Sequence, residues 1–482
     1  MEMTAHYKKA YARHATLQGN LIMVGFGSVG QALMTLLFRN IDIRPDQVRV
    51  ISADEKGEGI AHEFGVAYTP CALTEKNYLD VLEPCLMAGD FLLNLSVDVS
   101  SLALMDLCRR HDTLYLDTCI EPWSGGYTDR SVPASMRSNY ALREKALAFR
   151  REKGVGPTAL LAHGANPGLV SAFVKQALLN VAADTGVAVE KPVKGEGWAK
   201  LAFGLGIKAI HIAERDTQVA AQRKRLDEFV NTWSVDGFIG EGLQPSELGW
   251  GTHERHWPAD AGLHESGCDA AIYLNRPGAH TRVRSWTPLS GSYHGFLITH
   301  GESISIADHL TLKNSQGGGE VIYRPTVHYA YHPCDDAVLS LHEWAGRNWH
   351  VQSVKRILRD EIVEGADELG VLLMGHSRGA YWYGSRLSIH EARQLARYNS
   401  ATSMQVAAGV LAGMVWVLRN PDAGVVEPDD IDHEVVLDVA QPYLGEMTGV
   451  YTDWTPLRDR ETLFQEDMDR DDPWQFKNVR VT

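Results

Sequence analysis

The feature that most constrains the fold is a glycine pattern near the N-terminus, GFGSVG at residues 25–30, which fits G-x-G-x-x-G. It follows a short apolar run and precedes a segment with helical spacing, as in a strand–turn–helix unit that binds a dinucleotide. In such a unit Gly25 permits the tight turn, Gly27 lets the backbone approach a pyrophosphate, and Gly30 packs the helix against the strand. The pattern therefore predicts a dinucleotide at the N-terminus of the helix.

Four further apolar runs in the first part of the chain predict the remaining strands of this domain. They cover residues 47–54, 90–98, 113–119 and 157–166. Their spacing leaves room for crossover helices, and their continuous apolar character is typical of parallel strands that are covered on both faces. We therefore predict an α/β Rossmann domain with a parallel sheet.

The chain changes character after Asn166. The segment 167–183 predicts a helix with a proline in its first turn, whereas the alternation in residues 294–300 and 303–312 predicts antiparallel strands. These segments indicate an α+β second domain. We predict a Rossmann domain over residues 1–165, a substrate and dimerisation domain over 166–400, and a C-terminal helix and tail over 401–482 that returns to pack on the Rossmann domain.

Charge and hydropathy exclude two classes of partner. The formal net charge is -15 and there is no basic stripe, which argues against nucleic acid. The longest apolar stretch, residues 404–418, is shorter than the ~20 residues that span a bilayer, and it predicts a buried helix capped by Ser400 or Thr402. The N-terminus lacks the apolar run of a signal peptide. We expect a cytoplasmic protein without a membrane anchor.

Neither the cysteines nor the histidines have the spacing of a metal site. The six cysteines are scattered with no CxxC pair, which suits a reducing cytoplasm. The segment 253–256, HERH, is one residue short of HExxH, so its histidines would not share a helix face. We expect no bound metal.

A carboxylate follows the second predicted strand. Asp54 lies where it can hold the ribose hydroxyls, and it favours NAD over NADP because it would repel a 2′-phosphate. Polar side chains at the ends of later strands belong to the same crevice, although such residues are as often helix caps. The residues expected to contact NAD are Gly25, Gly27, Ser28, Val29, Gly30, Asp54, Asn94, Ser96, Thr118 and Ala165.

A second motif competes with this interpretation. Residues 375–379, GHSRG, match the nucleophile elbow G-x-S-x-G of α/β-hydrolases, with Ser377 as the nucleophile. The segment that follows, residues 380–387, has strand character instead of the helix that an elbow requires, and no HGGG-like oxyanion loop precedes it. The sequence disfavours a serine hydrolase and keeps it as an alternative.

Four residues in two polar, aromatic stretches could form a cation site: Glu214, Trp233, Asp236 and Glu241. Carboxylates beside an exposed indole suit an alkylammonium ion, because a desolvated cation–π contact contributes ~2 kcal/mol or more. Taken alone, these residues favour a simpler interpretation, in which Trp233 belongs to the core and the acids are solvated.

Longer sequence blocks carry a closer resemblance. They include residues 94–102, 117–123, 137–144, 164–168, 206–218, 229–252, 281–288, 302–308, 323–343, 411–416 and 450–457. With these blocks the chain resembles the bacterial homospermidine synthases, within the saccharopine dehydrogenase-like superfamily, from about Gly25 to the tail. Only residues 1–20 fall outside the resemblance, and we expect them to form a surface or disordered arm.

The resemblance implies an enzyme that keeps NAD as a prosthetic group. Two putrescine molecules, or spermidine and putrescine, would condense to homospermidine with release of ammonia. One amine would be oxidised to an imine, the second amine would attack it, and the NADH formed would reduce the new Schiff base. The resemblance also implies a homodimer whose partners are small polyamines.

The resemblance further implies roles at matching motif positions. Glu214, Trp233, Asn166 and His300 would act on the reacting amine, and Asp98, Glu121 and Glu241 would bind the diamine. It leaves the main proton carrier open between Glu214 and His300. Two alternatives remain: a saccharopine-type amino-acid dehydrogenase, which would need arginines in its pocket, and an NAD-binding regulator without chemistry.

Overall fold

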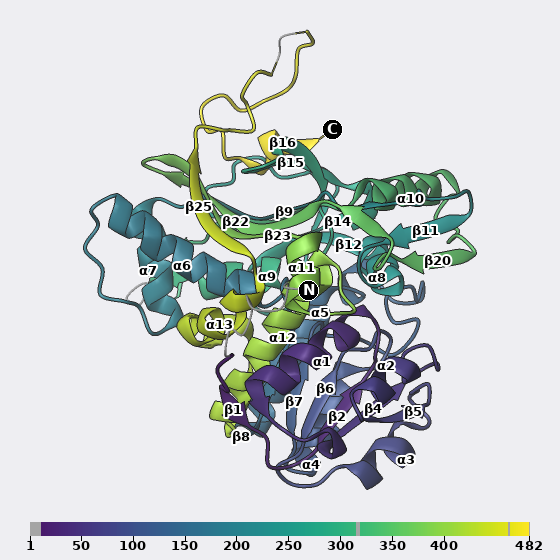
Figure 1. The fold of residues 1–482 in the computed structure, drawn as a ribbon. Helices are drawn as coiled ribbons and strands as arrows, with labels where there is room; N and C mark the ends of the chain where they lie inside the picture. Colours follow the sequence, from purple (N-terminus) through teal and green to yellow (C-terminus); the bar gives the residue numbers. More distant parts are fainter. Residues whose placement is uncertain (1–10, 315–318, 461–462, 482) are drawn as a thin grey trace, which may run out of the picture.

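The computed structural model describes residues 11–314, 319–460 and 463–481, and it is built on two sheets stacked end to end (Figure 1). The lower sheet is parallel throughout, with strand order β24-β8-β7-β6-β2-β4-β5. Its strands are β2 (Leu21–Val24), β4 (Val48–Ser52), β5 (Ala67–Pro70), β6 (Phe91–Asn94), β7 (Leu114–Asp117), β8 (Gly156–Leu160) and β24 (Ala423–Val426). The predicted Rossmann fold is confirmed.

Helices cover both faces of the parallel sheet, and two of them begin at serine caps. They are α1 (Ser28–Asn40), α2 (Glu58–Glu63), α3 (Tyr78–Leu82), α4 (Ser101–Arg110) and α5 (Asn139–Lys153). The side chains of Ser100 and Ser138 accept backbone N–H groups at the starts of α4 and α5. All four residues of β2 are buried, as expected for a strand between two helical layers.

The upper sheet is mixed and carries most of the second domain. Its main path is β13-β14-β12-β19-β9-β22-β23-β25, and β15, β16 and β26 extend it. Only β19 and β9 run parallel to each other within it. The strands are β9 (Ala209–Asp216), β12 (Pro245–Gly249), β13 (Ala261–Leu263), β14 (Ala271–Pro277), β15 (Arg282–Thr287), β16 (Gly291–Phe296), β19 (Thr326–His332), β22 (Ala366–His376), β23 (Gly379–Ser388), β25 (Glu446–Thr452) and β26 (Arg480–Val481).

Helices and a two-stranded ribbon flank the mixed sheet. The helices are α6 (Leu169–Asp184), α7 (Gly195–Leu205), α8 (Val235–Leu243), α9 (Glu302–His309), α10 (Asp335–Gly346), α11 (Ile389–Leu395), α13 (His433–Ala440) and α14 (Phe476–Val479). The ribbon pairs β11 (Glu228–Asn231) with β20 (Val354–Ile357) in parallel. Helix α6 confirms the helix predicted after Asn166, two residues later than expected.

The strand predicted over residues 303–312 is wrong, because this segment forms helix α9. Nearly every residue of α9 is buried, including Glu302, Ser303 and Ser305. A helix enclosed on all sides need not show a 3.6-residue pattern, so the alternation of serine and isoleucine carried no information about period. The alternating segment just before it does contain a strand, the end of β16.

The segment after residue 400 is shared between the two sheets. Helix α12 (Ala401–Arg419) packs beside α1, and β24 joins the parallel sheet next to β8 (Figure 1). The chain then crosses to the mixed sheet, where β25 pairs with β23 and β26 pairs with β15. The end of the chain, from β25 to β26, therefore lies against the second domain, whereas α12 and β24 lie on the Rossmann domain. The domain boundaries themselves remain a prediction.

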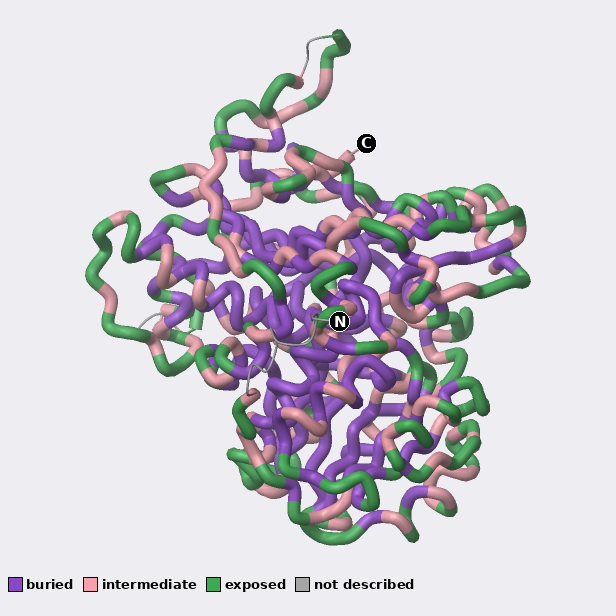
Figure 2. Tube along the Cα trace, in the orientation of Figure 1, coloured by how far each residue is buried: buried purple, intermediate pink, exposed green. Residues whose placement is uncertain are grey.

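Helix α12 is the one helix of the described chain with the length and hydropathy of a membrane span. Within it, 83% of the apolar 18-residue stretch is buried inside the protein. Ser400 caps it with the side chain accepting from Ser403 N, which confirms one of the two predicted caps. Figure 2 shows buried backbone running through α12 and both sheets. Its apolar sequence is therefore explained by core packing.

Half of the predicted N-terminal arm, residues 1–10, lies outside the described residues. The other half lies on the Rossmann domain. There β1 (Ala15–Thr16) pairs with β3 (Ile41–Asp42), and Tyr11 stacks on Tyr443 with ring centroids 5.5 Å apart.

Candidate active site

The glycine pattern forms the turn between β2 and α1. Gly25 has φ +88°, and a Cβ there would lie 2.7 Å from the backbone of Leu95, so this position requires glycine. A Cβ on Gly27 would meet nothing within 4 Å, which leaves open space in front of the helix cap. A Cβ on Gly30 would lie 3.1 Å from the Phe26 ring, the close packing expected there. The turn thus presents free space and a helix N-terminus, as a dinucleotide pyrophosphate requires.

Ser28 and Val29 open α1, in line with that space. The other predicted cofactor residues lie at the carboxyl ends of the parallel strands. Asn94 ends β6 and accepts a hydrogen bond from Ser96 Oγ at 2.6 Å, so this pair fixes the loop. Thr118 follows β7, and buried Ala165 follows β8. All of them line the edge at which dinucleotides bind in such sheets.

Asp54 lies just beyond β4 with its side chain about half exposed. Its carboxylate accepts the backbone N–H of Lys56 at 2.9 Å and lies 3.2 Å from Lys56 Nζ. The carboxylate predicted to hold the ribose therefore has the Lys56 ammonium beside it. The sequence predicted a role for Asp54 but none for Lys56.

Asn166 and Glu214 meet where the loop after β8 of the parallel sheet approaches the mixed sheet. Asn166 follows β8, and Glu214 lies on β9 of the mixed sheet with 2% of its surface exposed. Asn166 Nδ2 donates to Glu214 Oε2 at 3.0 Å. Tyr329 on the neighbouring strand β19 also donates its hydroxyl to Glu214. The carboxyl group is therefore held by one donor from the loop after β8 and one donor from strand β19.

The electrostatics separate the two candidate proton carriers. Burial raises the pKa of Glu214 to about 8. Burial alone would lower the pKa of His300, but Glu241 and Glu302 raise it well above its ordinary value. His300 Nε2 lies 2.9 Å from Glu241, and its Nδ1 lies 3.2 Å from Glu302. His300 is thus an imidazolium between two carboxylates, whereas Glu214 titrates close to neutral pH.

Trp233 is partly buried and packs against the edge of the hydrophobic core. Its Nε1 donates to Tyr331 Oη at 3.1 Å, and Tyr331 is the register partner of Glu214. The ring of Tyr331 stacks on that of Tyr329 at 5.1 Å. The indole is therefore oriented by β19, the same strand from which Tyr329 donates a hydrogen bond to Glu214.

Three further predicted acids gather between the domains. Asp98 N donates to Glu121 Oε2 at 3.4 Å, and Asp98 has a left-handed backbone, φ +63°. Burial, together with the nearby charges of Glu241 and Asp98, raises the pKa of Glu121 to about 8. Burial also raises the pKa of Asp98. Carboxyls held together in this way favour cationic ligands, because a cation relieves their repulsion.

Sequence reasoning missed three groups of this site: Tyr329, Tyr331 and Glu302. The alternation of Tyr329 and Tyr331 in the segment 326–332 marks a strand but does not reveal its neighbour. Only the parallel register with β9 brings them to Glu214. Glu302 directly precedes the segment that was predicted to be a strand and begins helix α9 instead.

The hydrolase motif lacks the geometry it needs. Ser377 is exposed in the two-residue turn that joins antiparallel strands β22 and β23, and β23 stands where an elbow helix would begin. The hydrolase alternative is therefore contradicted.

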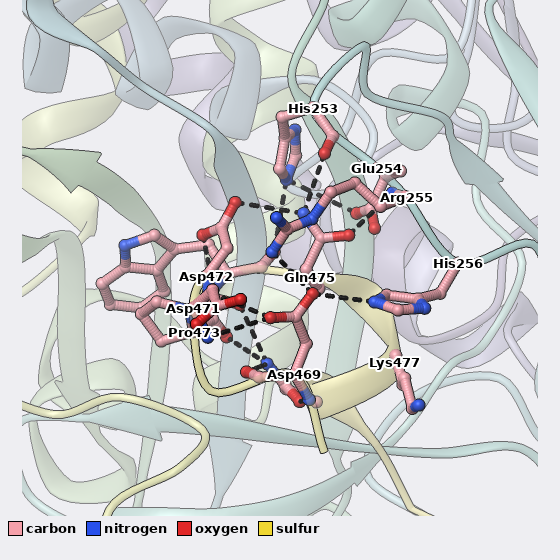
Figure 3. Close-up of polar contacts among 12 residues, drawn as sticks. His253, Glu254, Arg255, His256, Asp469, Asp471, Asp472, Pro473, Gln475 and Lys477 are labelled. Atoms are coloured by element: carbon pink, nitrogen blue, oxygen red, sulfur yellow. Dashed lines mark hydrogen bonds and ion pairs between the residues drawn. The ribbon is translucent and has the colours of Figure 1, made fainter. Parts of the chain in front are cut away.

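The segment 253–256 is a loop that anchors the C-terminal tail (Figure 3). His256 Nε2 lies 2.7 Å from Asp469 Oδ2, and buried Glu254 accepts the backbone N–H of Phe476 at 2.9 Å. Within residues 11–314, 319–460 and 463–481 no group of His, Cys, Asp or Glu side chains is arranged to hold a metal ion.

Two family descriptions cover almost the whole chain. The saccharopine dehydrogenase NADP binding domain matches residues 21–160, and the saccharopine dehydrogenase C-terminal domain matches residues 164–452. The second match alone spans more than half of the sequence.

Individual relatives extend this result. The chain is 55% identical over 469 residues to a homospermidine synthase of Blastochloris viridis, covering 96% of this chain and 98% of that protein. It is 51% identical over 474 residues to the homospermidine synthase of Mesorhizobium japonicum, covering 97% of each. The crystal structure of the homospermidine synthase of Legionella pneumophila in complex with NAD has a TM-score of 0.91 and 51% identity, covering 97% of this chain and 98% of that one. This chain belongs to the homospermidine synthase family of saccharopine dehydrogenase-like proteins.

Proposed function

We propose that the protein is an NAD-dependent homospermidine synthase that condenses two putrescine molecules, or spermidine and putrescine, and releases ammonia. The observation that supports it most is the pairing of Glu214 on the mixed sheet with Asn166 from the loop after β8, beside Trp233 and a group of carboxylates. These groups suit an amine substrate. A saccharopine-type substrate would need arginines for its carboxylates instead.

The residues present fit NAD. Gly25, Gly27 and Gly30 shape the turn, Ser28 and Val29 begin the helix, and the open space in front of Gly27 has room for a pyrophosphate. When bound, NAD supplies the hydride acceptor of the first step and the hydride donor of the last. The strand-end residues Asp54, Asn94, Ser96, Thr118 and Ala165 would line the rest of its cleft.

Glu214 is the proton carrier in this proposal. A primary amine has a pKa of ~10.4, so the substrate arrives as an ammonium and must lose a proton before hydride leaves its carbon. Glu214 accepts that proton, while Asn166 and Tyr329 hold the carboxyl in place. His300 keeps its charge between Glu241 and Glu302 and therefore serves to position Glu241.

Trp233 and the outer acids complete the assignment. The face of Trp233 stabilises the cationic iminium of the substrate, which forms when one amine is oxidised and is attacked by the second. Asp98, Glu121 and Glu241 bind the far ammonium of the diamine and so select the chain length of the diamine that fits the site. Ammonia then leaves, and the new carbon–nitrogen double bond is reduced, so that there is no net oxidation. This sequence requires water to be kept from the imine, because water would hydrolyse it.

We further propose a homodimer that works in the cytoplasm with polyamines as its partners and without nucleic acid or membrane. Net charge of -15 supports an affinity for cations over nucleic acid.

The experiment that tests the function incubates the purified protein, carrying only its own nucleotide, with putrescine. Mass spectrometry should find homospermidine, and ammonia should appear in equal amount without accumulation of NADH. Absence of homospermidine even with added NAD would overturn the proposal. The alternative would then be an NAD-binding regulator. For such a protein the double variant W233A/E214Q should bind NAD as the unaltered protein does, and neither should form homospermidine.

A further inference from the structure

A lysine faces the carboxylates at the outer end of the site. Lys355 lies on β20, and its ammonium contacts Asp236 in the first turn of α8. The two side chains are 42% and 56% exposed, so this ion pair is open to solvent. Helix α8 continues to Glu241, and Trp233 directly precedes the cap of the helix. Lys355 and Asp236 therefore stand beside the elements that carry the substrate residues.

The same pair acts on the opposite domain. Asp98 belongs to the Rossmann side, and burial is the main cause of its raised pKa. The charge of Asp236 raises it further, whereas the charge of Lys355 lowers it. Electrostatic effects of this kind require proximity. Asp98, Asp236 and Lys355 thus form the rim between the two domains, and Lys355 is the cation of that rim.

The chemistry of the lysine side chain makes the arrangement specific. A lysine ends in a primary ammonium on a flexible four-carbon stem. Putrescine carries the same ammonium on the same length of carbon chain. We propose that Lys355 is a specificity-determining residue, an internal competitor that occupies Asp236 until the ammonium of an arriving polyamine replaces it.

This inference rests on the proposed function. It explains why a rim rich in carboxylates does not retain a monoamine, because such a ligand would only exchange one ammonium for another at Asp236. A diamine or triamine replaces the Lys355 ammonium with one end and gains a second contact when its other end reaches Glu214.

The test measures KM and kcat for putrescine in K355M, which keeps the aliphatic stem and removes the charge. An exposed ion pair contributes a factor of about two to five, so KM should fall by that factor while kcat changes little. D236N should raise KM. The fall in KM should disappear at 1 M salt, where the screening length is only about 3 Å. Equilibrium dialysis of labelled putrescine against the NAD-loaded enzyme should give the same fold-change in Kd.

The matched control is K200M. Lys200 forms an exposed ion pair with Glu196 on α7, remote from Asp236, and its loss should leave KM and Kd unaltered. An unchanged or higher KM in K355M, or an equal fall in K200M, would overturn the inference. Homospermidine formation by the unaltered enzyme in the same assay separates this failure from a failure of the proposed function.

Discussion

Asn166 Nδ2 donates to Glu214 Oε2 at 3.0 Å, and this hydrogen bond joins the loop after β8 of the parallel sheet to β9 of the mixed sheet. It ties the residue proposed to carry the proton to the loop that follows β8. The position of the carboxyl therefore depends on how the two domains meet.

Replacing Asn166 by alanine should leave the fold intact and slow the reaction. Hydrogen bonds to charged groups contribute about 1.5–3 kcal/mol, so kcat should fall about tenfold to a hundredfold. Steady-state kinetics would measure this, with melting temperature as a check on folding. S377A is the control, because Ser377 is exposed in a hairpin turn and should have full activity. Equal losses in both variants would contradict the assignment.

The pH dependence should report Glu214. Burial raises its pKa to about 8, and it accepts a proton only when ionised. In the proposed mechanism kcat/KM for putrescine should therefore rise with pH up to about 8 and then level off. E214Q should lose this dependence along with a factor of ~10²–10⁴ in rate. A flat profile for the unaltered enzyme between pH 6 and 9 would exclude Glu214 as the proton acceptor.

Burial of Glu214 also has a consequence for stability. Its folded pKa lies above the ordinary value of 4.5, so its stabilising contribution is complete below that value and is lost as pH rises through about 8. The substrate-free protein should therefore melt at lower temperature at pH 9 than at pH 6, and E214Q should show a smaller difference. Thermal unfolding at the two pH values measures both; an equal difference in the two proteins would refute this.

Trp233 should act through the face of its ring. W233A should lose about 2 kcal/mol of stabilisation of the cationic intermediate, or a factor of about thirty in kcat. Y331F removes only the hydrogen bond to the indole Nε1 and should have a small effect. Single-turnover rates of both variants would decide between the two roles, since equal losses would mean that Trp233 serves only to pack against β19.

The first two glycines of the turn should respond differently to alanine. G25A forces a positive φ and a 2.7 Å approach to Leu95, so it should unfold the domain or lower its melting temperature strongly. A Cβ on Gly27 meets no protein atom, so G27A should fold but lose bound NAD because it fills the space of the pyrophosphate. Nucleotide content after denaturation and melting temperature test both statements. Full NAD content in G27A would contradict the proposed cofactor site.

The Rossmann domain was predictable because its signals are local. The turn at Gly25 needs a positive φ, and the buried strands β2, β6 and β7 are apolar up to their last residue. Strand β5 was missed because it lies at the sheet edge and is largely exposed, so it has no apolar pattern. Strand β24 was missed because it comes from the far end of the chain.

The site was only partly predictable for a related reason. Glu214 and Asn166 could be named through resemblance, but their hydrogen bond depends on how two domains pack. Tyr329 reaches Glu214 through the register of two strands more than a hundred residues apart, for which the sequence has no local signal. Lys355 belongs to no recognisable motif, and its link to the site is its ion pair with Asp236.

The central claim is that hydride taken from one amine returns to the same substrate carbon without leaving the enzyme. We would supply putrescine deuterated at the carbons that bear nitrogen, add a large excess of unlabelled free NADH, and weigh the homospermidine by mass spectrometry. We expect the product to retain all of its deuterium, because the cofactor stays bound between the two hydride transfers. Loss of one deuterium to the free NADH pool would show that the cofactor exchanges during turnover, and absence of labelled homospermidine would contradict the proposed function itself.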